Sequence, residues 1–154
     1  MALASTAQRL DAIDVDAAPI GGLLAALDDL RILRGSASAL EARIARRLAE
    51  RNGAGEAPPV SDTLTRSKRS SRREAEKAER RADALGSAPD VERHLTRGRI
   101  SDEHVDALAN AASKLDDERR DELFDLQHEL ADRACSTTPA GFARHLGTVI
   151  DQLD

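Results

Sequence analysis

The side chains that could carry catalysis or hold a metal do not converge in this sequence. His94 and His104 are ten residues apart, and no Cys or carboxylate pair stands at metal-ligand spacing to them. His104 is expected to cap or pack against the start of its own helix. Cys135 has no neighbouring base that would activate it as a nucleophile. The sequence therefore predicts no metal, no cofactor and no catalytic residue.

Acidic residues are concentrated near the C-terminal end, where they alternate with Arg119, Arg120 and Arg133. The run consists of Glu118, Asp121, Glu122, Asp125, Glu129 and Asp132. This helical spacing is typical of a solvated face with ion pairs rather than of paired catalytic carboxylates. If the chain binds DNA, such an acidic face would orient the DNA toward the basic side of the molecule.

Basic residues are concentrated in the middle of the chain. Positions 66–99 hold eleven Lys or Arg and six Asp or Glu, a net charge of +5, so the rest of this −5 chain carries −10. The segment 60–85 has the layout of a helix-turn-helix: a short helix, a basic link and a second helix. That second helix begins at the capping box Ser71-Arg72-Arg73-Glu74. A recognition helix enters the major groove by its N-terminal end, where cations and small polar groups contact DNA.

We therefore predict a set of DNA-binding residues in and after this segment. Ser70, Arg72 and Arg73 would lie at the groove, and the others would contact phosphates. The full set is Arg66, Lys68, Arg69, Ser70, Arg72, Arg73, Lys77, Arg97 and Arg99.

Several short motifs across the chain resemble a known family. They are Ser70–Ala75 (SSRREA), Ala82–Leu85, Pro89, Gly98–His104 (GRISDEH) and Thr138–Phe142. Together they resemble the domain of unknown function 222, the N-terminal helical domain of actinobacterial HNH endonuclease and 13E12 repeat proteins. The middle of the chain is also similar to the helix-turn-helix region of ParB-type partition proteins.

These resemblances imply a DNA-binding helical core. Nuclease activity is not implied, because nothing after Thr138 supplies the Cys or His clusters of an HNH domain. The family's usual Trp-Leu pair before the link is also missing, since Leu64 stands in Asp-Thr-Leu-Thr. The chain is thus expected to be no enzyme, unless it is a fragment of a longer HNH endonuclease and serves to regulate or target it.

The elements that must position these residues are predicted to be helices only. Aromatic residues make up 1% of the chain, which disfavours a β-sandwich or barrel. The expected architecture is an N-terminal helical region over residues 1–53, with a long helix or helical hairpin from Pro19 to Asn52 as a possible dimerisation or packing arm, then a helical core over 60–154. Shorter helices are expected at 5–13, 60–66, 71–85, 89–97, from 101, from 116 or 117, and from 139 to about 153.

The long helix carries an apolar stripe that needs a partner. Its members recur every three or four residues: Leu23, Leu27, Leu30, Leu33, Ala37, Leu40, Ile44 and Leu48. Gly35-Ser36 could bend the helix or split it into a hairpin. The stripe would pack either against later helices of the same chain or against a second copy.

Two functions of different classes follow from these patterns. The first is a module that binds double-stranded DNA. The alternative is a protein-interaction or dimerisation protein that uses the long Leu-rich helix and has no role with nucleic acid. A single cysteine, no membrane-spanning run and no signal peptide lead us to expect a cytoplasmic protein with no membrane partner.

Overall fold

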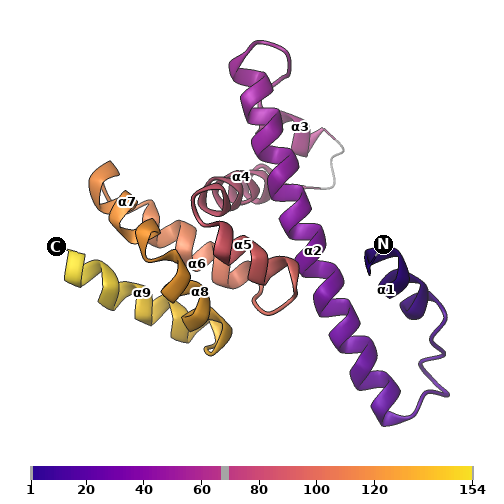
Figure 1. The fold of residues 1–154 in the computed structure, drawn as a ribbon. Helices are drawn as coiled ribbons and strands as arrows, with labels where there is room; N and C mark the ends of the chain where they lie inside the picture. Colours follow the sequence, from indigo (N-terminus) through magenta and orange to yellow (C-terminus); the bar gives the residue numbers. More distant parts are fainter. Residues whose placement is uncertain (1, 67–69, 154) are drawn as a thin grey trace.

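The computed structural model describes residues 2–66 and 70–153, and these residues form nine helices and no strand (Figure 1). In chain order the helices are α1 (Ala2–Asp11), α2 (Ile20–Gly53), α3 (Val60–Thr65), α4 (Arg72–Ser87), α5 (Pro89–Thr96), α6 (Asp102–Ala112), α7 (Asp117–Asp125), α8 (Gln127–Cys135) and α9 (Pro139–Leu153). The all-α prediction is confirmed. None of these helices combines the length and the apolar character needed to cross a bilayer.

Local capping residues explain where several helices begin. The Ser71 hydroxyl accepts a hydrogen bond from the Glu74 N–H at 3.2 Å, and the Thr138 hydroxyl accepts one from the Gly141 N–H at 3.1 Å. Each bond satisfies a backbone donor that has no partner inside its helix. Pro89 opens α5, where the missing proline N–H has no consequence.

Helix α2 is continuous through Gly35 and Ser36, so the hairpin alternative is wrong. These two small residues instead let the C-terminal end of α5 approach α2 closely. A side chain at position 35 would collide with the Leu95 carbonyl oxygen, and the Ser36 hydroxyl donates to the Thr96 carbonyl at 2.7 Å. Small residues in α2 therefore serve packing between helices rather than bending.

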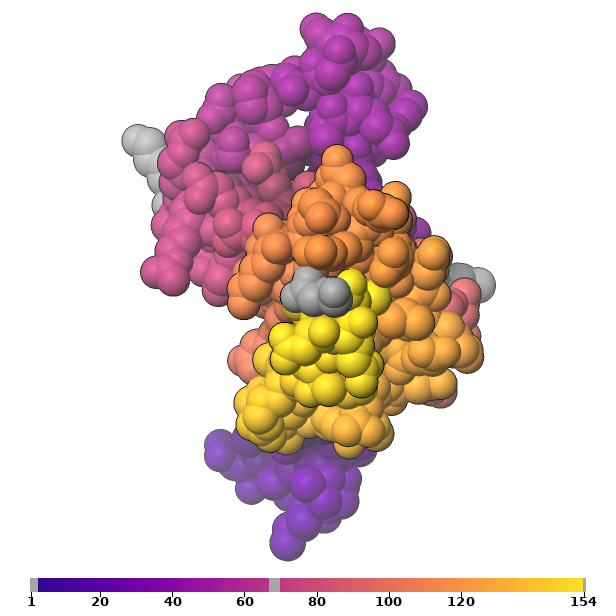
Figure 2. Space-filling view, turned by 90° about the vertical axis from the view of Figure 1, so that its left-hand side faces the viewer, coloured from indigo at the N-terminus to yellow at the C-terminus, as the bar shows by residue number. Residues whose placement is uncertain are grey.

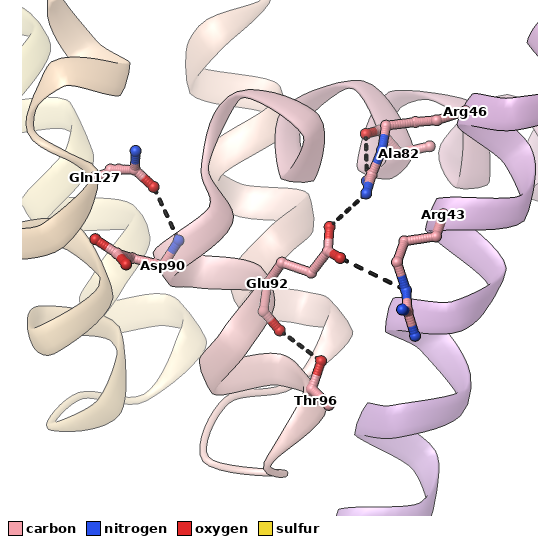
Figure 3. A network of polar contacts seen from close by, with 7 residues as sticks. All are labelled: Arg43, Arg46, Ala82, Asp90, Glu92, Thr96 and Gln127. Carbon is pink, nitrogen blue, oxygen red and sulfur yellow. Dashed lines mark hydrogen bonds and ion pairs between the residues drawn. The ribbon is translucent and has the colours of Figure 1, made fainter. Parts of the chain in front are cut away.

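Ion pairs between α2 and α5 reinforce this contact (Figure 3). The Arg46 guanidinium donates to Glu92 Oε2 at 2.8 Å and to the Ala82 carbonyl of α4 at 3.3 Å. Arg43 lies 3.8 Å from the other oxygen of Glu92. The Glu92 side chain is only 16% exposed, so these arginines compensate a carboxylate that is largely removed from water.

The face of α2 that packs inward is the opposite of the one that the apolar stripe suggests. The buried residues of α2 are Gly35, Ser36, Ala39, Ala42 and Ala45. Leu40 is 43% exposed and Ile44 52% exposed, while Leu27 is exposed and Leu23, Leu30, Leu33 and Leu48 are half-buried. The predicted packing of the stripe against later helices of the same chain is therefore wrong for Leu40 and Ile44. Ala has no side chain beyond Cβ, so helices meet most closely along a row of Ala.

Helix α1 packs against the first half of α2, on the opposite side from α5 and α6 (Figure 1). Arg9 holds it there through a paired contact with Asp29, with N···O distances of 2.8 and 3.0 Å. Between α1 and the first half of α2 runs an apolar groove of about 450 Å³, lined by Leu10, Ile13, Val15, Leu23, Ala26, Leu27 and Leu30. The N-terminal half of the stripe thus faces α1.

The other helices pack around Leu and Val side chains. Val91, Leu95, Val105, Leu108, Leu123, Leu130, Phe142 and Leu146 are nearly inaccessible to solvent. His104 links α6 to the segment before α9. Its Nδ1 accepts a hydrogen bond from the Ser101 N–H at 3.2 Å. Its Nε2 donates a hydrogen bond to the Thr137 carbonyl oxygen at 2.9 Å. The expectation that His104 caps and packs at its helix start is confirmed.

The acidic stretch forms two helices instead of one. Helix α7 ends at Asp125, and α8 begins at Gln127 after Leu126, which has φ −87° and ψ 9°. Leu123 of α7 and Leu130 of α8 are both buried. The expectation of one helix from 116 or 117 is wrong at Leu126, where the helix is interrupted.

Candidate nucleic-acid interface

The start of α4 presents exposed basic side chains beside a capped helix N-terminus. Ser71 caps the helix, and Arg72 and Arg73 occupy its first turn with their side chains in solvent. Cations at this end oppose the helix dipole, which favours negative charge there. The position of these two arginines is therefore unfavourable with respect to the helix dipole, and an external anion would offset it.

Most of these cations are weakly paired or unpaired. Arg72 lies 3.6 Å from Glu76 and Lys77 lies 3.8 Å from Glu74, both exposed pairs of the kind that contributes little to stability. Within residues 2–66 and 70–153, Arg66 and Arg73 have no carboxylate partner. Their charges are free to meet a ligand.

Sequence reasoning left one further cation out of the predicted set. Arg80 is exposed and follows Arg73 by seven residues, so both lie on one side of α4. The seven-residue spacing was the signal that could have found it. We call Arg66, Ser70, Arg72, Arg73, Lys77 and Arg80 the basic corner. Glu76 and Asp83 are also exposed on α4, so the surface is mixed in charge.

The inner side of α4 fixes the direction of this surface. Ala75, Ala82 and Leu85 are buried. Arg81, next to Arg80, points inward, and its guanidinium donates two hydrogen bonds to the Asp106 carboxylate of α6, at 2.7 and 2.9 Å. The hydrogen bonds that Arg81 donates to the Asp106 carboxylate raise the pKa of Arg81. Arg81 therefore anchors α4, while its sequence neighbour remains available to a ligand.

Two predicted DNA-binding residues lie elsewhere. Arg97 and Arg99 are exposed in the α5–α6 loop on either side of Gly98, which packs against Ile32 of α2. Figure 1 shows this loop well separated from α3, and Figure 2 shows the segment around residues 60–80 along one edge of the molecule. The structure does not join these two arginines to the basic corner. Lys68 and Arg69 lie outside the described residues.

His94 and Cys135 are the remaining side chains that could carry chemistry. His94 Nδ1 is buried without a hydrogen-bond partner in the described part of the chain. Burial lowers the pKa of His94 and raises that of the Cys135 thiol. No three His, Cys, Asp or Glu side chains gather as metal ligands within the residues that the structure describes.

Comparison of the chain with family models, curated proteins and solved structures gave no match. The family resemblance stated above therefore stays a prediction from the quoted motifs.

Proposed function

We propose that this chain binds double-stranded DNA through the basic corner. The observation that carries the proposal is the pair Arg66 and Arg73, which bracket the α3–α4 link and have no carboxylate partner among the described residues. Phosphate oxygens would supply the missing negative charge.

The order of the elements supports this mode of binding. A short helix, α3, packs against α4, and Ser70 just before α4 and Arg72 and Arg73 in its first turn are exposed. A helix presented in this way can place its first turn in the major groove while residues of the preceding link contact the backbone. Arg80 lies farther along α4, on the same side as Arg73.

The aromatic residues favour duplex over single-stranded nucleic acid. The chain has two Phe, no Tyr and no Trp. Phe142 is fully buried and Phe124 is half-buried against the core. Proteins that bind single strands usually stack bases on exposed aromatic side chains. A charged surface without such side chains fits an intact duplex better.

Fluorescence anisotropy with a labelled duplex at low salt tests the proposal. We expect wild-type binding and a marked loss in Arg66→Ala/Arg73→Ala. The matched control is Arg133→Ala/Arg144→Ala, which removes the same charge from exposed positions on α8 and α9. Absence of wild-type binding at tens of micromolar protein, or equal binding by the two double variants, would refute the proposal.

A further inference from the structure

The second half of α2 has an apolar row that no other described helix covers. Beyond Leu30, this row continues with one apolar residue every three or four positions. We call its four members the outer stripe: Leu33, Ala37, Leu40 and Ile44. Ala37, Leu40 and Ile44 are exposed, and Leu33 is half-buried. The buried residues Ala39, Ala42 and Ala45 lie on another face of the same helix.

The first half of the same row shows how this face accepts a helix. Leu23, Ala26 and Leu30 line the groove beside α1, and Arg9 of α1 pairs with Asp29. Helix α1 has ten residues, which is too short to follow all 34 residues of α2. Among the described residues, Leu40 and Ile44 have no equivalent cover.

Two charged residues flank the outer stripe along one edge. Arg34 and Glu41 are seven residues apart, so they lie on the same side of α2, and both are exposed. Neither has an ion-pair or side-chain hydrogen-bond partner in residues 2–66 and 70–153. An antiparallel copy of α2 would place Arg34 near Glu41 of the second copy, and by symmetry the contact would occur twice.

We propose that a second copy of this chain docks antiparallel on the outer stripe. In the register in which Ala37 of each copy faces Leu40 of the other and Leu33 faces Ile44, Glu41 lies two residues from the position directly opposite Arg34, on the same edge of the interface. The small Ala37 then meets the larger Leu40, and the two large side chains of Leu33 and Ile44 pack against each other, as core side chains of paired helices do. The same surface is apolar at its centre and has complementary charges at its edge, so the surfaces of two copies are complementary. This interface is independent of DNA binding.

Sedimentation velocity on the full chain tests whether the outer stripe forms the interface. We expect a dimer for wild type and a monomer for Leu40→Glu and Ile44→Glu, with unchanged helicity because both side chains are already exposed. The matched control is Leu24→Glu, at a position that is 59% exposed on the same helix but outside the stripe. Dimer retention in Leu24→Glu supports the proposal. A wild-type monomer at high micromolar concentration overturns it, as does equal dissociation of all three variants.

Charge reversal tests the register separately. Arg34→Glu alone and Glu41→Arg alone each place like charges near one another twice, so each is expected to weaken the dimer about tenfold or more. A mixture of the two variants restores both attractive pairs and should form a heterodimer. The double variant Arg34→Glu/Glu41→Arg should again form a homodimer. If neither the mixture nor the double variant recovers association, the antiparallel register is wrong.

Discussion

Ala42 and Ile44 are two residues apart in α2 and face in opposite directions. Ala42 is 4% exposed and packs in the core, whereas Ile44 is 52% exposed. Two residues span about 200° around a helix, so the difference in environment follows from helical geometry. The smaller side chain lies inside because α4 and α5 approach α2 closely on that side.

This relationship predicts opposite sensitivities to substitution. Ala42→Leu adds bulk where helices are in close contact, and we expect it to lower the free energy of unfolding by about 1–3 kcal/mol. Ile44→Ala removes bulk from solvent, and we expect a change within about 0.5 kcal/mol. Urea unfolding at low protein concentration, where the chain is monomeric, measures both. A larger loss in Ile44→Ala than in Ala42→Leu would show that the packing face is assigned wrongly.

Gly98 is expected to tolerate no side chain. Its φ is +69°, and a Cβ there would lie 2.8 Å from the Ile32 Cα. The left-handed conformation alone costs a non-glycine residue about 1–2 kcal/mol, and the collision adds to it. Gly98→Ala should therefore lower the melting temperature clearly. Gly147→Ala is the control: nothing lies near a Cβ in α9, and alanine favours a helix by up to about 1 kcal/mol. Similar melting temperatures for the two variants would contradict the close contact.

Because of His94, we expect the folded chain to lose stability at mildly acidic pH. Burial lowers its pKa in the folded chain, and Arg99 lowers it further, while Asp132 acts in the opposite sense. The unfolded chain therefore binds a proton more readily, so the free energy of unfolding falls as the pH drops below about 6.5, the ordinary histidine pKa. His94→Gln should make stability depend less on pH between about 5 and 7.5. Urea midpoints at several pH values test this, and an unchanged slope would exclude His94 as the cause.

DNA binding should weaken steeply with salt. Each phosphate contact contributes about 0.9 to the slope of log affinity against log salt concentration. Arg66→Ala/Arg73→Ala should therefore reduce that slope by about two, whereas Arg133→Ala/Arg144→Ala should leave it unchanged. Anisotropy titrations between about 50 and 200 mM salt provide the measurement. A wild-type affinity independent of salt would contradict a contact made through phosphates.

Local sequence signals determined where most helices begin and end. The Ser71 capping box acts within a few residues, so the sequence predicts the start of α4 well, and Pro89 and the Thr138 cap are local signals of the same kind. The expectation of a single helix from 116 or 117 was wrong, because the turn at Leu126 depends on how α7 and α8 pack against the other helices.

Only the tertiary structure decided which surfaces are buried and which remain available. Periodicity shows that α2 has an apolar row, but it does not reveal that Gly35, Ala39 and Ala42 pack more closely against neighbouring helices than leucines could. The chain order likewise gathers arginines in one segment, whereas the fold separates Arg97 and Arg99 from the basic corner. Local propensity acts over one helical turn, while burial depends on residues far apart in the sequence.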